Sequence, residues 1–265
     1  MRSEQHGAEA DGGAEAEDGA PLDQDRRRIT EVLAAAVTGL DRYRAPEALC
    51  RACAGLLPVT GASISLTASS TVRTIWCASD DTAARLAETQ YTLGDGPCRS
   101  ALELASPVLA ADLTQGSDVR RWPVFAQQAL DLGVRAAFSL PLGTSALAIG
   151  TLDLYRDSPG ALSGRDLRIA LLVRDAVTFA VLNLHQDPSE DPDPGPDGGV
   201  ASWVAAAEAD HAEAHQAIGM IMASLGVDPD QALDRLRAHA FAHGRTVSEV
   251  ARDVIARRIR FTSPG

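Results

Sequence analysis

The chain has 265 residues, a formal net charge of −12 at pH 7 and a hydrophobic fraction of 45%. This length and apolar fraction suffice for one ordinary folded domain and a smaller one, and they exclude a chain that is disordered throughout. No apolar run reaches the roughly 18 residues of a membrane-spanning helix, and the acidic start lacks the apolar core of a secretory signal, so we expect a cytoplasmic protein without a membrane partner.

Two segments of unusual composition divide the chain. Residues 1–24 combine low hydrophobicity with many carboxylates, which predicts a disordered acidic tail. Residues 187–200 are rich in Pro, Asp and Gly and cannot continue a helix or a strand, so we expect a linker there. The residues between them, 25–186, and the residues after the linker, 201–265, are then predicted to form two separate domains.

The larger domain is predicted to be α+β. In chain order its hydrophobic patterns predict helices at 25–40 and 46–57, a hairpin over 61–80, two helices separated by a glycine-rich turn over 80–104, a strand at 107–113, a helix at 122–133, a strand pair that turns near Gly143 over 134–156, and a long helix over 163–185. This order implies an antiparallel sheet with helices packed beside it.

Three segments of this domain resemble a known family. LGDGPC (93–98), RWPVFAQQALDLGVRAAFSLPL (121–142) and GTLDLYRDSPGALS (150–163) are similar to GAF sensor domains of actinobacterial regulators, over residues 25–186. The resemblance implies a domain that holds a small-molecule ligand over its sheet or serves to dimerise. The candidate pocket residues are aromatic side chains that suit the core or an interface at least as well, namely Trp76, Tyr91, Trp122, Phe125, Phe138 and Tyr155.

The same domain lacks residue types that several cofactor sites require. No histidine lies within its core, which argues against a histidine-ligated haem, a Cys-His nucleophile pair and most mixed zinc sites. The chain contains no lysine, so it cannot carry the Asn-Lys signature in which cyclic-nucleotide-binding GAF domains resemble one another. We therefore expect no cofactor and no metal.

The four cysteines allow more than one interpretation. Cys50, Cys53, Cys77 and Cys98 could form a four-thiolate metal site, or the first two could be a redox pair. Cys50 and Cys53 also share an apolar helix stripe, where a free thiol behaves as a small hydrophobe, and we favour that interpretation, with reduced thiols. Cys98 lies at a predicted helix N-terminus that would stabilise a thiolate, and it would support an alternative function, a GAF-type methionine sulfoxide reductase.

The C-terminal domain is predicted to contain three helices. The first, from about 202 to 225, repeats apolar or small residues in steps of three and four, which is typical of a coiled-coil seam between two copies of a chain. The candidate seam residues are Val204, Ala207, His211, Ala214, Ile218, Ile221 and Leu225. Gly226 suits the end of this helix, and Asp228 and Thr246 suit the starts of the second and third. We expect an all-α domain that forms a homodimer.

Two stretches of this domain, AIGMIM (217–222) and LGVDPDQALDRLRAHAFAHGRTVSEVARDVI (225–255), resemble the ANTAR domain, the RNA-binding module of transcription antiterminators. The resemblance covers about residues 204–260. It implies a dimeric regulator, and not an enzyme, that binds tandem hairpins in mRNA leaders and prevents termination under the control of the GAF domain. The family's central Ala-Lys-Gly is Ala-Ile-Gly here, with Ile218 in place of the lysine.

The C-terminal end is locally basic, because from residue 231 onward seven arginines accompany three carboxylates. The candidate RNA-binding residues are arginines outside the apolar faces, two histidines that can stack on bases, and two small residues better suited to close helix packing: Arg237, Arg245, Arg252, His239, His243, Ala217 and Gly219. We expect Arg257, Arg258 and Arg260 to neutralise the C-terminal dipole of the third helix. DNA binding through a helix-turn-helix is the alternative, because a short turn with Gly244 joins the last two helices.

Overall fold

A computed structural model of the chain describes residues 15–41, 44–67, 73–144, 147–183 and 201–262. We name residues 15–183 the sheet region and residues 201–262 the three-helix region. The predicted linker, 187–200, lies outside the described residues. Within the described ranges, none of the helices combines the length and the hydropathy that a bilayer crossing requires.

The sheet region contains one antiparallel sheet and the helices packed on it. Its elements are α1 (Glu15–Val37), α2 (Ala45–Gly55), β1 (Gly61–Thr67), β2 (Arg73–Ala78), α3 (Asp81–Leu93), α4 (Pro97–Leu104), β3 (Val108–Ala110), α5 (Gly116–Arg121), α6 (Pro123–Asp131), β4 (Ala136–Thr144), β5 (Leu147–Arg156) and α7 (Gly164–Asn183). The strand order is β2-β1-β5-β4-β3, so β5 lies at the centre. The predicted α+β class and antiparallel sheet are confirmed.

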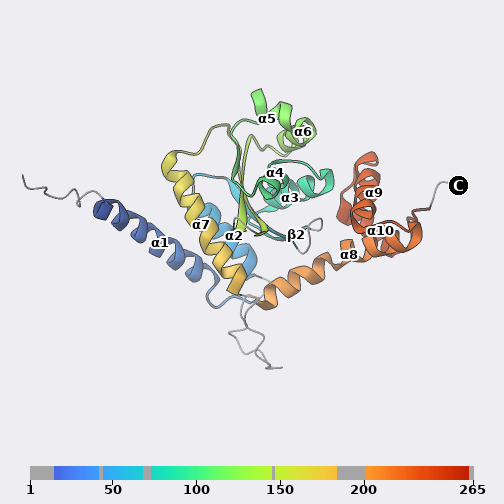
Figure 1. The fold of residues 1–265 in the computed structure, drawn as a ribbon, viewed down its shortest axis with the longest axis horizontal. Helices are drawn as coiled ribbons and strands as arrows, with labels where there is room; N and C mark the ends of the chain where they lie inside the picture. The colour runs from blue at the N-terminus through green and yellow to red at the C-terminus, as the bar shows by residue number, and fades with distance from the viewer. Residues whose placement is uncertain (1–14, 42–43, 68–72, 145–146, 184–200, 263–265) are drawn as a thin grey trace, which may run out of the picture.

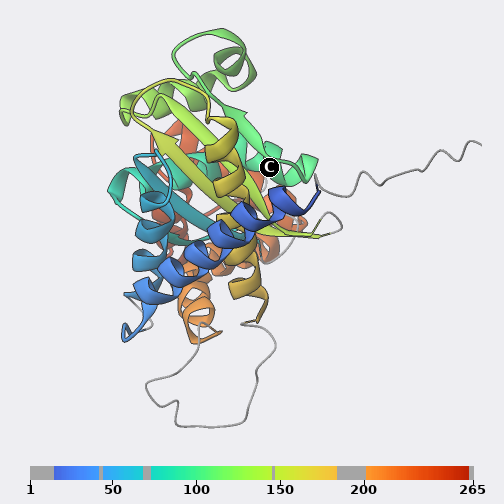
Figure 2. The same cartoon turned by 90° about the vertical axis from the view of Figure 1, so that its left-hand side faces the viewer.

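Helices cover both faces of this sheet, and β5 shows why. Its side chains alternate, so that Leu152 and Leu154 enter a core with α1, α2 and α7, whereas Tyr155 enters a second core with α3, α4 and α6. Figure 1 shows the first set of helices on one side of the sheet and α3 and α4 on the other. Figure 2 looks onto the first face, where α1 packs against α2 and α7. Both faces of β5 are therefore buried.

The start of the first helix differs from the sequence-based expectation. Helix α1 begins at Glu15, so residues 15–24 are helical and not part of a disordered tail. The buried side chains of Ile29 and Leu33 anchor this helix on the sheet region. Strand β4 ends at Thr144 and β5 begins at Leu147, which confirms the strand pair predicted to turn near Gly143; that glycine, with φ of +111°, lies at a register shift between the two strands.

The sulfur atoms of Cys50 in α2 and Cys77 in β2 are joined in a disulfide. The expectation of reduced thiols is therefore wrong for this pair. The two residues are 27 apart in the sequence, and both are buried in the core between the sheet and α1, α2 and α7. The spacing of the cysteines in the sequence does not indicate this disulfide, because Cys50 and Cys77 come together only when α2 packs on the sheet.

The three-helix region consists of α8 (Ala201–Leu225), α9 (Pro229–Ala242) and α10 (Val247–Ile255). The Asp228 side chain accepts a hydrogen bond from the Gln231 amide, and Thr246 forms a reciprocal capping box with Glu249. The buried core contains Ile218, Ile221, Leu233, Leu236, Val250 and Val254. The three predicted helices and their caps are confirmed.

Candidate nucleic-acid interface

Arg237, predicted to lie free for RNA, is held by the sheet region. Its Nε donates a hydrogen bond to the backbone oxygen of Tyr91, 3.0 Å away, at the end of α3. The guanidinium carbon lies 5.5 Å from the centre of the Tyr91 ring, within cation–π range. Gly94, with φ of +63°, ends α3, and a Cβ there would lie only 3.2 Å from guanidinium atoms. The Arg237 side chain is 14% exposed and is not available to RNA in this arrangement.

The end of α3 also caps the start of α10. Thr92 Oγ1 accepts a hydrogen bond of 3.1 Å from the Val247 amide, and a Glu88 carboxylate oxygen accepts one of 3.2 Å from the Ser248 amide. Amides in the first turn of a helix have no hydrogen-bond acceptor within the helix, so side chains of α3 supply acceptors for the first amides of α10. Tyr91 is buried in the core of the three-helix region. The two regions therefore share both hydrogen bonds and apolar surface at α3.

Arg245 and Arg252 form ion pairs within the three-helix region. Arg245 Nη2 lies 2.8 Å from Asp253 Oδ2, and Arg252 Nε lies 3.7 Å from Glu213 Oε2. Arg258 Nε also contacts Asp253, at 2.6 Å, and the hydrogen bonds from Arg258 and Arg245 hold the pKa of Asp253 below its ordinary value. Arg245 is thus partly neutralised, whereas Arg252 is exposed and weakly paired.

His239 and His243 form an aromatic row with Phe261. The two imidazole centres lie 4.1 Å apart in a stacked arrangement, and Phe261 meets His239 edge-on at 5.5 Å. Burial, together with the neighbouring His243 and Arg245, lowers the pKa of His239. A neutral, stacked imidazole presents a flat face of the kind that unstacked bases bind. Phe261 was not among the predicted residues, because it lies beyond the last helix.

Ala217, Gly219 and the predicted seam residues have separate environments. Ala217, Ile218 and Ile221 are buried in the chain's own three-helix core, and Ala214 is buried outside it. Gly219 is exposed, and no atom lies within 4 Å of a Cβ placed there, so it is not needed for close packing. Leu225 packs on the edge of that core. The side chains of Val204, Ala207 and His211 lie outside the described residues, so the seam stays a prediction.

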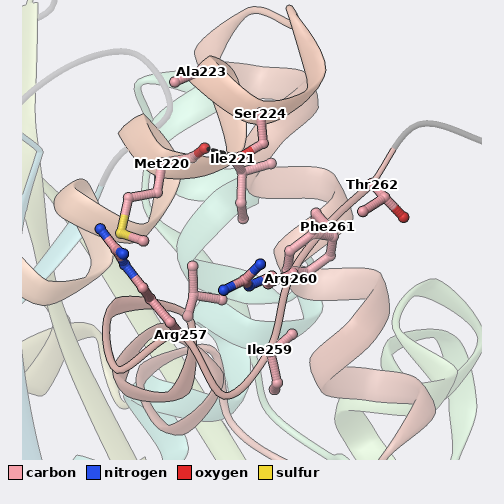
Figure 3. Close-up of a pocket in the computed structure, with 10 residues that line it drawn as sticks. Met220, Ile221, Ala223, Ser224, Arg257, Ile259, Arg260, Phe261 and Thr262 are labelled. Atoms are coloured by element: carbon pink, nitrogen blue, oxygen red, sulfur yellow. Dashed lines mark hydrogen bonds between the residues drawn. The ribbon is translucent and has the colours of Figure 1, made fainter.

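A pocket of about 650 Å³ lies between the end of α8 and the segment that follows α10. Arg257, with φ of +57°, turns the chain so that this segment returns along α8 (Figure 3). The lining includes an apolar set and two arginines: Ile221, Val254, Ile259, Phe261, Arg257 and Arg260. Among the described residues, neither arginine has a carboxylate partner. The pocket combines an apolar floor with two available positive charges.

The expected role of this segment in neutralising the dipole of α10 does not account for that arrangement. Of its three arginines, Arg258 pairs with Asp253, whereas Arg257 and Arg260 line the pocket. The signal in the sequence was the presence of Ile259 and Phe261 among these arginines, since apolar residues just beyond a helix can pack on its core. Figure 3 shows the side chains of Arg257 and Arg260 on the side of the segment that faces α8.

The aromatic residues predicted to line a ligand pocket in the sheet region are distributed over three cores. Trp76 and Phe138 lie in the core with α1 and α2; Trp122, Phe125 and Tyr155 lie in the core with α3 and α6; and Tyr91 lies in that of the three-helix region. The structure therefore does not bring them together around one site. Tyr155 donates a hydrogen bond of 2.9 Å to Asp80, the N-cap of α3, and burial together with this bond raises its pKa to about 12.

The remaining cysteines are buried. Burial raises the pKa of Cys53 to about 12, so its thiol stays protonated at neutral pH. Cys98 is in the first turn of α4, as predicted, but its side chain is fully buried, which leaves it without access to a peroxide or a sulfoxide. In the part of the chain that the structure describes, no cluster of three or more His, Cys, Asp and Glu side chains is arranged to hold a metal.

The three-helix region matches a known protein family. Residues 204–255, which include most of α8 and all of α9 and α10, match the ANTAR domain family. No curated protein matches the chain.

Solved structures similar to the chain include GAF domains. The GAF domain of a phosphoenolpyruvate-protein phosphotransferase from Coxiella burnetii is 12% identical, with a TM-score of 0.46, over 64% of this chain and 97% of that one. The corresponding domain from Acinetobacter is 10% identical, with a TM-score of 0.45, over 63% and 96%. The phycocyanobilin-bound GAF domain of a cyanobacterial phytochrome is 13% identical, with a TM-score of 0.44, over 64% and 98%.

Proposed function

We propose that the chain is a signal-responsive antitermination regulator, in which the three-helix region binds tandem RNA hairpins and the sheet region controls that binding. The observation that carries the proposal is the ANTAR match over residues 204–255, on helices whose exposed arginines supply charge for phosphates. The missing family lysine is consistent with the fold, because Ile218 is buried in the core. Exposed cations instead gather after α10, at Arg257 and Arg260.

Helix α3 is the proposed link between the two regions. Its first turn is fixed to the sheet, because the N-cap Asp80 accepts a hydrogen bond from Tyr155 of β5. Its last turn holds Arg237 and caps α10. A ligand or partner that shifts α3 on the sheet would therefore change these contacts and release Arg237. Homodimerisation through the N-terminal half of α8 stays part of the proposal.

The proposal is tested by fluorescence anisotropy with a tandem-hairpin RNA and a scrambled RNA of the same length at several salt concentrations. We expect tighter binding of the hairpin RNA, with an affinity that falls as salt rises because phosphate contacts release counterions. Equal affinity for the scrambled RNA would contradict RNA recognition. Tighter binding of a duplex DNA of equal length would establish the helix-turn-helix alternative instead.

A further inference from the structure

The pocket beside Phe261 matches the chemistry of one nucleotide. Its volume, about 650 Å³, falls within the range of small-ligand sites. The floor is apolar, with Ile221 and Val254 almost fully buried beneath it. The guanidinium groups of Arg257 and Arg260 stand beside that floor (Figure 3). A flat apolar group that carries negative charge fits this combination, and a nucleobase with its phosphate is such a group.

The surroundings favour a nucleotide within an RNA strand over a free one. Phe261, which lines the pocket, contacts His239 edge-on, and His239 stacks on His243, so further aromatic rings lie next to the pocket. Unstacked bases of RNA loops bind to aromatic rings and arginine planes in this way. Among the described residues, the pocket lining comes from α8, α10 and the segment after α10, and none of it from the sheet region.

We infer that this pocket binds one unstacked loop nucleotide, with its base against Ile259 and Phe261, above the buried Ile221, and its phosphate at Arg257 and Arg260. The inference rests on the proposed RNA-binding function and adds a base-recognition site to it. Arg257, Ile259, Arg260 and Phe261 all lie beyond the matched residues 204–255. The family match therefore covers one wall of the pocket, on α8 and α10, whereas both arginines and Phe261 come from the segment that follows it.

The test uses a series of tandem-hairpin RNAs in which one loop nucleotide at a time is made abasic, with the full chain and anisotropy as the readout. We expect wild-type protein to lose affinity at least about 5-fold for one abasic position, because the stacking of one base is lost. Ser224→Trp, at an exposed residue of the pocket lining, should weaken binding of the intact RNA by a similar factor and abolish the response to that abasic position. The matched control is Gln216→Trp, exposed on α8 outside the pocket.

A second experiment tests the contribution of the two arginine charges to RNA affinity. Arg257→Gln and Arg260→Gln should each reduce the slope of log affinity against log salt by about 1, whereas Arg51→Gln, at an exposed arginine of α2 in the sheet region, should leave it unchanged. Circular dichroism verifies that each variant is folded. Hairpin-specific RNA binding that is insensitive to the abasic positions, to Ser224→Trp and to both arginine changes would overturn the pocket while leaving the proposed function intact. Failure of the wild-type chain to prefer hairpin RNA would overturn both.

Discussion

At the scale of single residues, the environment of each charge decides its role more than its place in the sequence does. Arg237 and Arg245 were predicted to contact RNA, yet one is bonded to Tyr91 and the other to Asp253. Arg257 and Arg260, which were expected only to neutralise a helix dipole, face a pocket without a carboxylate partner among the described residues. The spacing of residues along a helix shows that a side chain lies outside the apolar face of that helix. It does not show which other element of the fold then covers the side chain.

His239 gives the three-helix region a dependence on pH. Its pKa in the folded chain lies below the ordinary value of about 6.5, so the unfolded chain binds more protons near and below that pH. Stability therefore rises with pH; the contribution is complete above the unfolded pKa and is lost as pH falls below it. Urea unfolding should show that acidification from pH 7.5 to 5.5 destabilises wild type more than His239→Gln. An equal change in both proteins would show that His239 does not contribute.

At the scale of elements, the contact between α3 and α10 is the most specific link between the two regions. Thr92→Val removes the oxygen that accepts from the Val247 amide while keeping the shape of the side chain. Hydrogen exchange at that amide should become faster, by about 2- to 10-fold, as expected for the loss of one net hydrogen bond. Thr89→Val, on the same helix, is the control and should leave the exchange rate unchanged. Unchanged exchange in Thr92→Val as well would argue against the docked arrangement.

The disulfide between α2 and β2 gives a second prediction at this scale. It closes a segment with a sequence separation of 27, for which chain-entropy arguments give roughly 3–4 kcal/mol of stabilisation. Addition of a reductant should lower the unfolding free energy of the sheet region by about that amount. The double variant Cys50→Ser, Cys77→Ser should not respond to the reductant. A wild-type protein whose stability is equally unaffected would show that the disulfide is not formed in solution.

The elements themselves were largely predictable, and the contacts between them were not. The strand alternation, the glycine that ends α3 and the caps of α9 and α10 are local signals, and the structure bears them out. The pairing of Cys50 with Cys77, the helical residues 15–24 and the docking of Tyr91 in the three-helix core depend on tertiary packing. No local pattern in the sequence encodes that packing. The sequence therefore indicated Arg237 as a candidate RNA-binding residue, whereas the structure indicates the segment after α10.

At the scale of the whole molecule, an acidic chain presents one locally basic end. The formal net charge is −12, but the pocket after α10 carries two arginines without carboxylate partners among the described residues. Local potential governs the approach of a polyanion, so the net charge does not oppose RNA binding at this end. Helix α3 connects the sheet to the same region, which gives a signal at the sheet a direct path to Arg237.

The central claim, that the chain binds hairpin RNA and prevents termination, is tested most directly by transcription in vitro. The template carries a tandem-hairpin leader whose second hairpin overlaps an intrinsic terminator, and a matched template has a scrambled leader. We predict that the full chain raises readthrough on the first template and leaves the second unchanged, with the effect weakened at high salt. Readthrough that stays constant on the hairpin template, or that rises equally on both templates, would contradict the account.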